Sequence, residues 1–211
     1  MEINGLNIDS VIVSNVGTNC YIVHKKDSKS CFVVDPGDDG EQIAAQIKKQ
    51  GLTIDHILLT HGHFDHIQGV RDLKNCMRAQ ICALDVEKGL LGDAKMNISA
   101  MTGRPEEIEA DLWLHDKQIF ESGGISIQVI HTPGHTRGSC CYYLEEEKVL
   151  FSGDTLFMES VGRTDFPTGN ERELLESLRE KVLVLPSETK VFSGHGPVTD
   201  IGYEQANNPY A

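Results

Sequence analysis

Short runs of β-branched and apolar residues alternate with polar turns over the N-terminal part of the chain. The runs are Val11–Val13, Cys20–Val23 and Cys31–Val34, and Gly17 and the polar segment Lys25–Lys29 separate them. Runs of this length between turn residues are typical of β-strands. We therefore expect the chain to begin with a β-meander.

Farther along, the pattern alternates between helical and strand-like spacing. In Glu41–Gln50 the apolar residues recur at helical intervals and Gly51 follows them, which predicts a helix with a C-terminal glycine. The apolar runs Ile54–Leu59 and Ile81–Leu84 predict two strands. Asp85–Leu91 is expected to form a further helix. This alternation indicates a chain of the α/β class.

The second half of the chain has the same character. Ile119–Glu121 and Ile125–Ile130 flank a Gly-Gly pair, which predicts a hairpin. Cys140–Leu144 and Val149–Phe151 predict a second hairpin. Glu171–Val184 is amphipathic with helical spacing and ends before a proline, so we expect a helix there.

The order of elements is repeated in the two halves. A Cys-Tyr pair at 20–21 opens a hairpin that is followed by a helix, a strand and His61. A second Cys-Tyr pair at 141–142 opens a hairpin that is followed by a helix, the strand at 191–192 and His195. Two similar halves would pack their sheets face to face under outer helices, which predicts a four-layer α/β/β/α sandwich.

The densest chemical signal lies at the end of the strand 54–59. The segment His61-Gly62-His63-Phe64-Asp65-His66 places three imidazoles and one carboxylate within six residues. Such groups repel one another when the histidines are protonated, and they become favourable neighbours when neutral histidine and ionised aspartate share a cation. The segment therefore predicts a metal site.

Three more candidate ligands follow other predicted strands, namely His135, Asp154 and His195. Loops at one edge of a packed sandwich can converge although they are far apart in sequence. With five histidines and two aspartates, the set exceeds what one tetrahedral ion uses, so we expect two ions. Asp154 is the expected bridge, because two carboxylate oxygens can hold ions about 3.5–4 Å apart.

Charge and cysteine content restrict the class of partner. The chain has 211 residues and a formal net charge of -13, which disfavours nucleic acid or an anionic membrane as the main partner. Its six cysteines show no Cys-x-x-Cys spacing, and we expect free thiols. No secretory signal or membrane-length apolar run is evident, so a cytoplasmic protein is expected.

The candidate ligands resemble the motif of the metallo-β-lactamase-fold hydrolases. The likeness rests on seven positions in order: His61, His63, Asp65, His66, His135, Asp154 and His195. Within that superfamily, the strings SGDTLF at 152–157, GRTDF at 162–166 and SGHGP at 193–197 resemble the compact bacterial glyoxalase II-like proteins, the hydroxyacylglutathione hydrolases. The resemblance implies the same α/β/β/α fold.

The resemblance also implies a role for each residue. His61, His63 and His135 would bind the first metal, Asp65, His66 and His195 would bind the second, and Asp154 would bridge them. Asp65 and Asp154 are the implied catalytic carboxylates. Asp35 matches a position that orients a ligand histidine without touching metal. The implied cofactors are two divalent ions, zinc first, with iron or manganese as alternatives.

The implied reaction is hydrolysis of a small-molecule thioester such as a hydroxyacylglutathione. Two cations lower the pKa of a bridging water toward neutrality, so that a metal-bridging hydroxide attacks the thioester carbonyl. The same ions stabilise the tetrahedral oxyanion. No serine or cysteine nucleophile is required.

The chain departs from full-length glyoxalase II beyond the last ligand. We expect a single domain over residues 1–211, without the C-terminal helical domain that supplies basic residues to glutathione. Arg163 is the candidate contact for a substrate carboxylate, and a surface pair between Arg163 and Asp165 is the alternative.

Two other functions stay open. Persulfide dioxygenases of the same fold resemble the chain in the Gly-Arg-Thr-Asp-Phe string and use one iron, which here would be held by His61, His135 and Asp154. A role in RNA processing, or a non-catalytic role, is the third alternative, and the acidic charge balance disfavours RNA.

Overall fold

The strand β3 (Thr18–Lys25) contributes to two cores at once. Cys20 and Ile22 point to one face of its sheet, Tyr21 and Val23 point to the other, and all four side chains are buried. Successive side chains of a strand point to opposite faces, so a strand that is apolar at successive positions must be covered on both sides. The sequence of this strand thus requires layers on both faces of the sheet.

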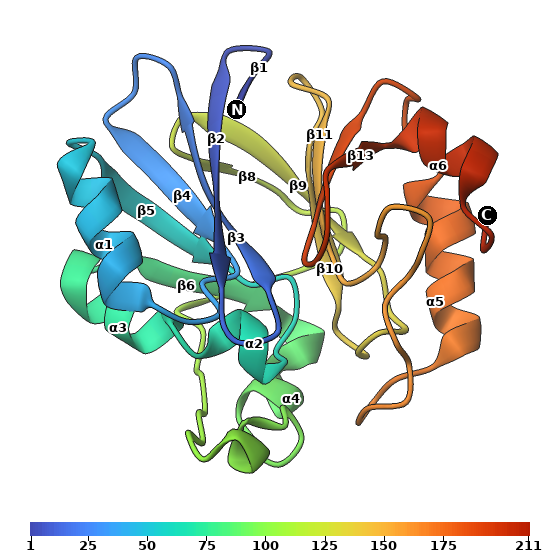
Figure 1. Cartoon of the computed structure of the whole chain (residues 1–211), viewed down its shortest axis with the longest axis horizontal. Coiled ribbons are helices and arrows are strands. Elements are labelled where there is room, and N and C mark those ends of the chain that lie inside the picture. Colours follow the sequence, from blue (N-terminus) through green and yellow to red (C-terminus); the bar gives the residue numbers. More distant parts are fainter.

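The computed structural model describes residues 1–211, and its first sheet has seven strands in sequence order (Figure 1). They are β1 (Glu2–Ile3), β2 (Leu6–Val13), β3, β4 (Ser30–Val34), β5 (Thr53–Leu58), β6 (Gln80–Leu84) and β7 (Leu112–Leu114). Neighbours from β1 to β4 pair antiparallel, and neighbours from β4 to β7 pair parallel. The predicted meander is therefore the antiparallel half of a mixed sheet.

The second sheet has six strands in the order β13-β12-β11-β10-β9-β8. They are β8 (Ile119–Ser122), β9 (Ile125–His131), β10 (Cys140–Leu144), β11 (Val149–Gly153), β12 (Lys190–Ser193) and β13 (Thr199–Asp200). The pair β11 and β12 is parallel and the other pairs are antiparallel. Both predicted hairpins are confirmed as β8–β9 and β10–β11.

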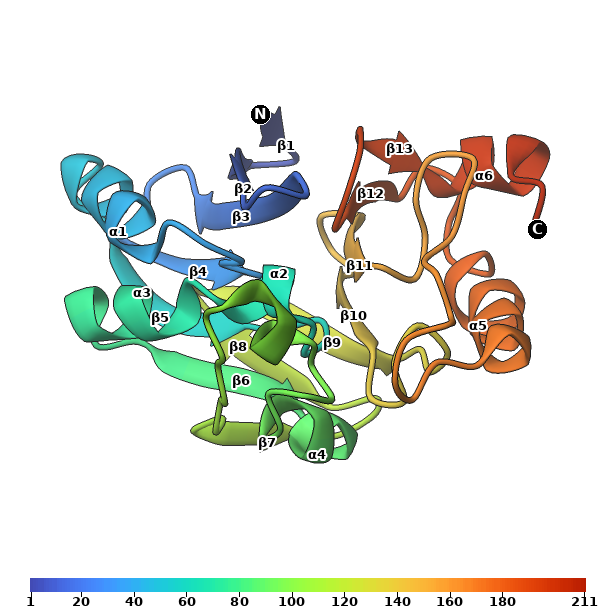
Figure 2. The same ribbon diagram turned by 60° about the horizontal axis from the view of Figure 1, so that its bottom comes forward.

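Helices cover the outer face of each sheet. The α-helices are α1 (Gly40–Lys49), α2 (Phe64–Ile67), α3 (Val70–Met77), α4 (Lys88–Leu91), α5 (Glu171–Ser177) and α6 (Ile201–Asn207), of which α1, α3, α5 and α6 form the outer layers. Short 3₁₀ turns, η1 (Asp85–Glu87) and η2 (Ser99–Thr102), flank α4. Figure 2 shows α1 and α3 on one side of the molecule and α5 and α6 on the opposite side.

Three apolar clusters separate these layers. One lies between the first sheet and helices α1 and α3, one lies between the two sheets, and one lies between the second sheet and the α5–α6 side. Aromatic rings from both sheets meet in the middle cluster, where the Tyr21 and Phe192 ring centroids are 5.4 Å apart. The predicted α/β/β/α sandwich is confirmed.

Several predicted elements differ from the structure in their bounds. The strand predicted at Val11–Val13 starts at Leu6, because the polar Asn7 and Asp9 alternate with buried Leu6 and Ile8. The helix predicted over Glu171–Val184 is α-helical only to Ser177 and continues as a π-helical turn over Leu178–Val182. The wider π turn buries Leu178 and Val182 against the second sheet.

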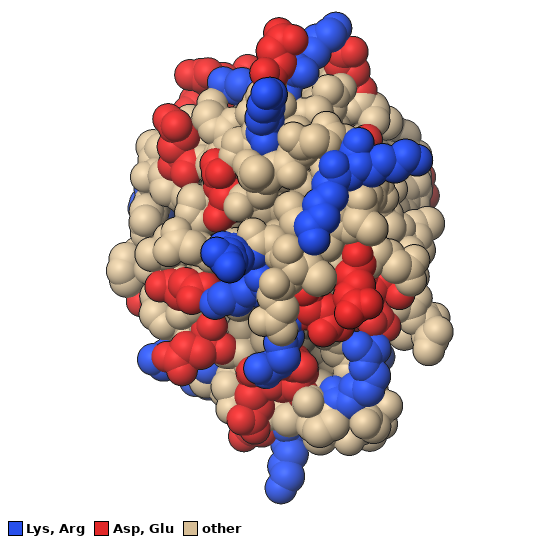
Figure 3. All heavy atoms as spheres, turned by 90° about the vertical axis from the view of Figure 1, so that its left-hand side faces the viewer, with Lys and Arg blue, Asp and Glu red and all other residues tan.

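No helix of the structure is both long enough and apolar enough to cross a membrane. On the face that carries α1 and α3, basic and acidic side chains are interspersed (Figure 3). Examples are the pairs Arg71–Glu106 and Lys74–Asp111. Opposite charges are therefore paired on this face.

Candidate metal centre

Every candidate side chain follows the end of a strand. Asp35 comes directly after β4, Asp154 directly after β11, and His195 two residues after the end of β12. His61 stands three residues after the end of β5, and His135 lies in the loop between β9 and β10. These strand ends share one edge of the sandwich, so the sequence places all the candidate groups together there.

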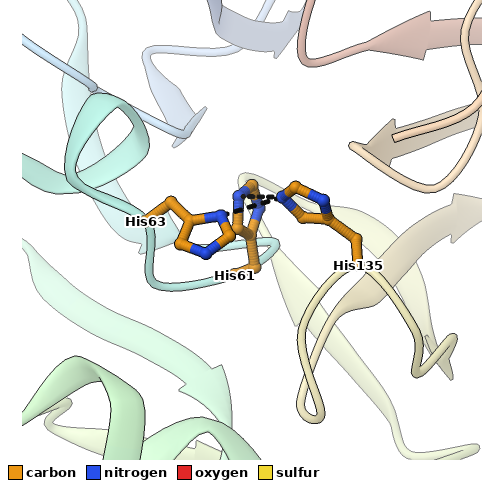
Figure 4. Close-up of side chains that lie close together, drawn as sticks. All are labelled: His61, His63 and His135. Atoms are coloured by element: carbon orange, nitrogen blue, oxygen red, sulfur yellow. Dashed lines mark hydrogen bonds between the residues drawn. The ribbon is translucent and has the colours of Figure 1, made fainter. Parts of the chain in front are cut away.

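Three histidines form the first set of candidate ligands (Figure 4). His63 Nδ1 lies 2.9 Å from His135 Nε2, which in turn lies 3.1 Å from His61 Nε2. All three residues are buried. Because a zinc–nitrogen bond is about 2.0–2.1 Å long, nitrogens that share one ion lie within roughly 4 Å of each other, and these separations meet that requirement.

The environment keeps these three imidazoles neutral. Burial, followed by the charges of neighbouring histidines, lowers the pKa of both His61 and His63 well below its ordinary value. Burial also lowers the pKa of His135. The Nδ1–H of His135 donates to the carbonyl of Arg163 at 2.7 Å, which leaves its Nε2 lone pair facing the other two rings. Converging lone pairs of this kind fit a cation.

Asp65, His66 and His195 form the second set. Asp65 Oδ2 lies 3.5 Å from His66 Nε2 and 3.3 Å from His195 Nε2. The same oxygen accepts a hydrogen bond of 2.8 Å from the Thr18 hydroxyl, a buried contact that no spacing in the sequence reveals. Asp65 and His66 both lie on the single turn α2, which brings them from adjacent positions to one centre.

Carboxylates change the protonation of this second set. Burial lowers the pKa of His66, but the surrounding carboxylates outweigh it and raise that pKa to about 10. Burial also opposes protonation of His195, yet contacts with Asp65 and Asp154 raise its pKa. For Asp65, burial is outweighed by His66 and His195, and its pKa is lowered. Protons on the two histidines therefore balance carboxylate charge where a cation would otherwise do so.

Asp154 lies between the two sets. Its Oδ2 is 3.5 Å from His135 Nε2 and 3.6 Å from His195 Nε2. Its Oδ1 is 3.4 Å from His66 Nε2, and both of these atoms are buried without a hydrogen-bond partner. Buried polar atoms are seldom left unpartnered. The donor types, their burial and these unpartnered atoms together fit two divalent cations with Asp154 between them.

Asp35 occupies the position expected of an orienting residue. Its carboxylate accepts hydrogen bonds from the Thr60 backbone N–H at 2.8 Å and from the Thr60 hydroxyl at 2.6 Å. It also accepts from His66 Nδ1 at 2.9 Å, which turns His66 Nε2 toward the centre. Asp35 lies close enough to His61 and His66 to be a ligand itself, but its oxygens are already engaged.

Two glycines allow close packing around Asp154, one against its carboxylate and the other against its backbone carbonyl. A Cβ at Gly194 would lie 2.2 Å from Asp154 Oδ1 and 2.8 Å from His66 Cε1. A Cβ at Gly162 would lie 2.0 Å from the Asp154 carbonyl oxygen and 3.0 Å from His135 Nδ1. Neither position has room for a side chain.

A tyrosine from each sheet supports the histidine loop of the other sheet. Tyr21 of β3 donates its hydroxyl to the carbonyl of Ser193 at 2.6 Å, two residues before His195. Tyr142 of β10 donates its hydroxyl to the carbonyl of Leu59 at 2.8 Å, two residues before His61. The sequence repeat pairs these two tyrosines but does not reveal what they contact.

The backbone repeats this reciprocal arrangement. The N–H of Asn19 donates to Gly194 O at 2.7 Å, and the N–H of Cys140 donates to Thr60 O at 2.9 Å. In each case the donor is two residues before the tyrosine and the acceptor is one residue before the histidine. The two halves are therefore related by matching hydrogen bonds across the sheets.

A small cavity opens onto the centre. It has a volume of about 230 Å³ and is lined by Val16, Phe64, Arg163, Phe166 and five of the candidate ligands. The Arg163 guanidinium lies 3.8 Å from the Phe166 ring centroid and forms two hydrogen bonds of 2.7 Å with Asp165. The predicted surface pair is thus present, and the Arg163 side chain stands at the mouth of the cavity.

Comparison with known proteins identifies the relatives of this chain. The family model described as the metallo-beta-lactamase superfamily matches residues 13–195. The chain is 38% identical over 204 residues to the probable metallo-hydrolase YqgX of Bacillus subtilis, covering 94% of each protein. It is 33% identical over 209 residues to the hydroxyacylglutathione hydrolase GloC of Haemophilus influenzae, covering 97% of this chain and 98% of GloC.

Solved structures agree with this similarity. The structure described as the B3 metallo-beta-lactamase BLEG-1 matches with a TM-score of 0.91 and 40% identity, covering 97% of this chain and 99% of BLEG-1. The structure of TTHA1623 in a di-iron-bound form matches with a TM-score of 0.86 and 33% identity, covering 96% of this chain and all of the other.

Proposed function

The chain belongs to the metallo-β-lactamase superfamily, and from this premise we propose that it is a metal-dependent hydrolase that cleaves small-molecule thioesters such as a hydroxyacylglutathione. One observation carries the proposal: two complete sets of nitrogen and oxygen donors meet at the carboxylate of Asp154. The similarity to GloC supports a thioester substrate.

The two sets of residues would each hold one metal ion. When bound, two divalent cations would supply a Lewis acid for the substrate carbonyl and a water that ionises near neutral pH. His61, His63 and His135 would hold one cation, and Asp65, His66 and His195 the other. Asp154 would contact both. Zinc suits this donor set, and the di-iron relative supports iron as the alternative.

The cavity walls suggest how a substrate is oriented. The Phe166 ring lies 5.5 Å from the His63 ring and provides an apolar surface next to the first set of ligands. The ion pair between Arg163 and Asp165 is exposed and therefore weak. Arg163 would release Asp165 and bind a substrate carboxylate in its place. The acyl group would then lie between Phe166 and Asp154.

A mononuclear-iron persulfide dioxygenase is the second candidate. It is favoured by the geometry of His61, His135 and Asp154, whose facing atoms are separated by 3.1 and 3.5 Å and could hold one iron. The hydrolase proposal is preferred because Asp65, His66 and His195 gather into a second set, which a single iron would leave unused.

A parallel assay distinguishes these functions. The protein is loaded with zinc or iron and tested for thiol release from S-lactoylglutathione, oxygen uptake with glutathione persulfide, and cleavage of a chromogenic cephalosporin. We expect metal-dependent thiol release that is lost in Asp154→Ala and kept in Asp27→Ala, an exposed aspartate on the distant β3–β4 turn. Oxygen uptake with one iron per chain, or cleavage of the cephalosporin alone, would contradict the proposal.

A further inference from the structure

Glu87 is a buried carboxylate outside both sets of candidate ligands. It ends the η1 turn and is 1% exposed. No lysine, arginine or histidine forms an ion pair with it. Burying an unpaired carboxylate is unfavourable unless hydrogen-bond donors replace water. The buried carboxylate of Glu87 therefore requires a specific set of hydrogen-bond donors.

Those donors come from the two loops that carry the first set of histidines. Glu87 Oε1 accepts from the N–H of Gly62 at 2.9 Å and from the hydroxyl of Thr136 at 2.8 Å. Glu87 Oε2 accepts from the N–H of Gly138 at 2.9 Å. Gly62 stands between His61 and His63, and Thr136 follows His135 directly. One carboxylate thus joins two loops that are more than seventy residues apart in sequence.

Close packing accompanies these hydrogen bonds. A Cβ at Gly138 would lie 2.5 Å from both the backbone nitrogen and Oε2 of Glu87. A Cβ at Gly62 would lie 2.7 Å from Leu90 Cδ2 and 3.0 Å from Leu91 Cδ2. At both glycines the backbone of the loop therefore packs directly against the turn formed by η1 and α4. A side chain on either glycine would separate the loop from that turn.

We propose that Glu87 is a positioning residue that sets the distance between the His61–His63 loop and the His135 loop, and thereby the geometry of the three-histidine metal site. This inference rests on the proposed metal-dependent function. Ligand atoms must be placed within about 0.2 Å for a metal site to form well. His63 Nδ1 and His135 Nε2, 2.9 Å apart, belong to the two loops that Glu87 joins, so release of one loop changes this separation.

The substitution Glu87→Gln tests the hydrogen-bond role without changing side-chain size. The amide oxygen can replace only one of the two carboxylate oxygens, so the amide N–H₂ must face a backbone N–H donor, that of Gly138 or that of Gly62, and one loop is repelled in either orientation. Gly138→Ala tests the same role from the opposite side, because it displaces the second loop from Glu87 and leaves the carboxylate intact. Gly138 does not have a positive φ, so the added methyl acts by steric contact alone.

Glu204 provides a matched control. It is also fully buried, and its carboxylate accepts from the N–H of Glu159 at 2.9 Å, the Asn208 amide at 2.9 Å and the Thr199 hydroxyl. None of these partners lies in the loops that carry the first set of histidines. Glu204→Gln therefore reproduces the loss of a buried, hydrogen-bonded carboxylate without releasing those loops.

The experiment titrates wild type and the three variants with zinc against a chelating indicator and records the visible absorption of the cobalt-substituted proteins. We expect Glu87→Gln and Gly138→Ala to bind one zinc about 10- to 100-fold more weakly, to keep the other, and to show an altered cobalt spectrum. Glu204→Gln should match wild type in affinity and spectrum, with comparable thermal destabilisation of the metal-free protein.

Wild-type affinity and spectrum in Glu87→Gln would overturn the proposal, as would equal losses in Glu204→Gln. If Glu87→Gln does not fold, Gly138→Ala decides, and unchanged zinc binding there would overturn it. A wild-type protein that binds no zinc, iron or manganese contradicts the proposed function before any variant is compared, so the two failures are distinguishable.

Discussion

Gly194→Ala should damage the metal centre while leaving the fold intact. Gly194 precedes His195, does not have a positive φ, and donates its N–H to the carbonyl of Gly153 at 2.8 Å. The added methyl carbon would lie 2.2 Å from Asp154 Oδ1. The effect is therefore steric and is directed at the carboxylate that lies between the two sets of ligands.

The size of the displacement follows from this distance. Real Cβ contacts are essentially never shorter than 3.0 Å, so the Asp154 carboxylate or the Gly194 backbone must move by at least the difference between 2.2 and 3.0 Å. A displacement of about 0.8 Å exceeds the roughly 0.2 Å tolerance of metal–ligand distances. A misplacement of about 1 Å reduces catalysis on the order of 100-fold. Overpacking costs about 1–3 kcal/mol, which most domains tolerate.

The assay combines bound metal per chain, the rate of thioester hydrolysis and thermal unfolding. We expect fewer than two ions per chain, about 100-fold slower hydrolysis, and cooperative unfolding in Gly194→Ala. Gly89→Ala is the control, because Gly89 is exposed on α4 and a Cβ there meets nothing within 4 Å. Wild-type metal content and activity in Gly194→Ala would refute the argument.

The structure makes four further predictions. Metal binding at pH 7 should release at least one proton, because the carboxylates around His66 raise its pKa to about 10 in the metal-free protein. Calorimetry in two buffers of different ionisation enthalpy measures the number of protons released, and a value of zero would contradict the prediction. Because the pKa of His66 is raised in the folded protein, its contribution to the stability of the metal-free protein should be complete below about pH 6.5 and should be lost as the pH rises toward 10. The free energy of unfolding, measured at several pH values, checks this prediction. Asp35→Asn should weaken the binding of one metal ion about 10- to 100-fold, since His66 loses the acceptor that orients it. A zinc affinity equal to that of wild type would exclude an orienting role for Asp35. Tyr142→Phe should lower the free energy of unfolding by about 1 kcal/mol, because the hydrogen bond to the Leu59 carbonyl is lost. Urea unfolding measures this free energy, and an unchanged value would show that the hydrogen bond does not stabilise the protein.

The repeat of similar halves predicted the layers, and the burial of β3 and β4 on both faces agrees with that prediction. The hydrophobic pattern did not predict α3 (Val70–Met77), since this short helix buries only Val70 and Leu73 and follows α2 after two residues. The π turn after Ser177 was also missed, because π and α turns place apolar residues at similar spacing. Packing against neighbouring elements determines such details.

Sequence reasoning identified the candidate ligands because their side-chain chemistry is distinctive and their spacing is short. It placed no chemistry near Glu87, Thr18 or Tyr142, and the structure brings all three against the loops of the centre. Two of them, Glu87 and Tyr142, contact mainly backbone atoms of distant segments, and Thr18 contacts the candidate ligand Asp65 itself. Contacts between residues so far apart depend on the tertiary fold and leave no periodic signal in the sequence.

Anomalous diffraction from a crystal of the metal-loaded protein tests the central claim most directly. We predict two anomalous peaks about 3.5–4 Å apart, one among His61, His63 and His135 and the other among Asp65, His66 and His195, with Asp154 between them. A single peak, or two peaks that do not share Asp154, would contradict the two-metal centre on which the proposed hydrolysis depends.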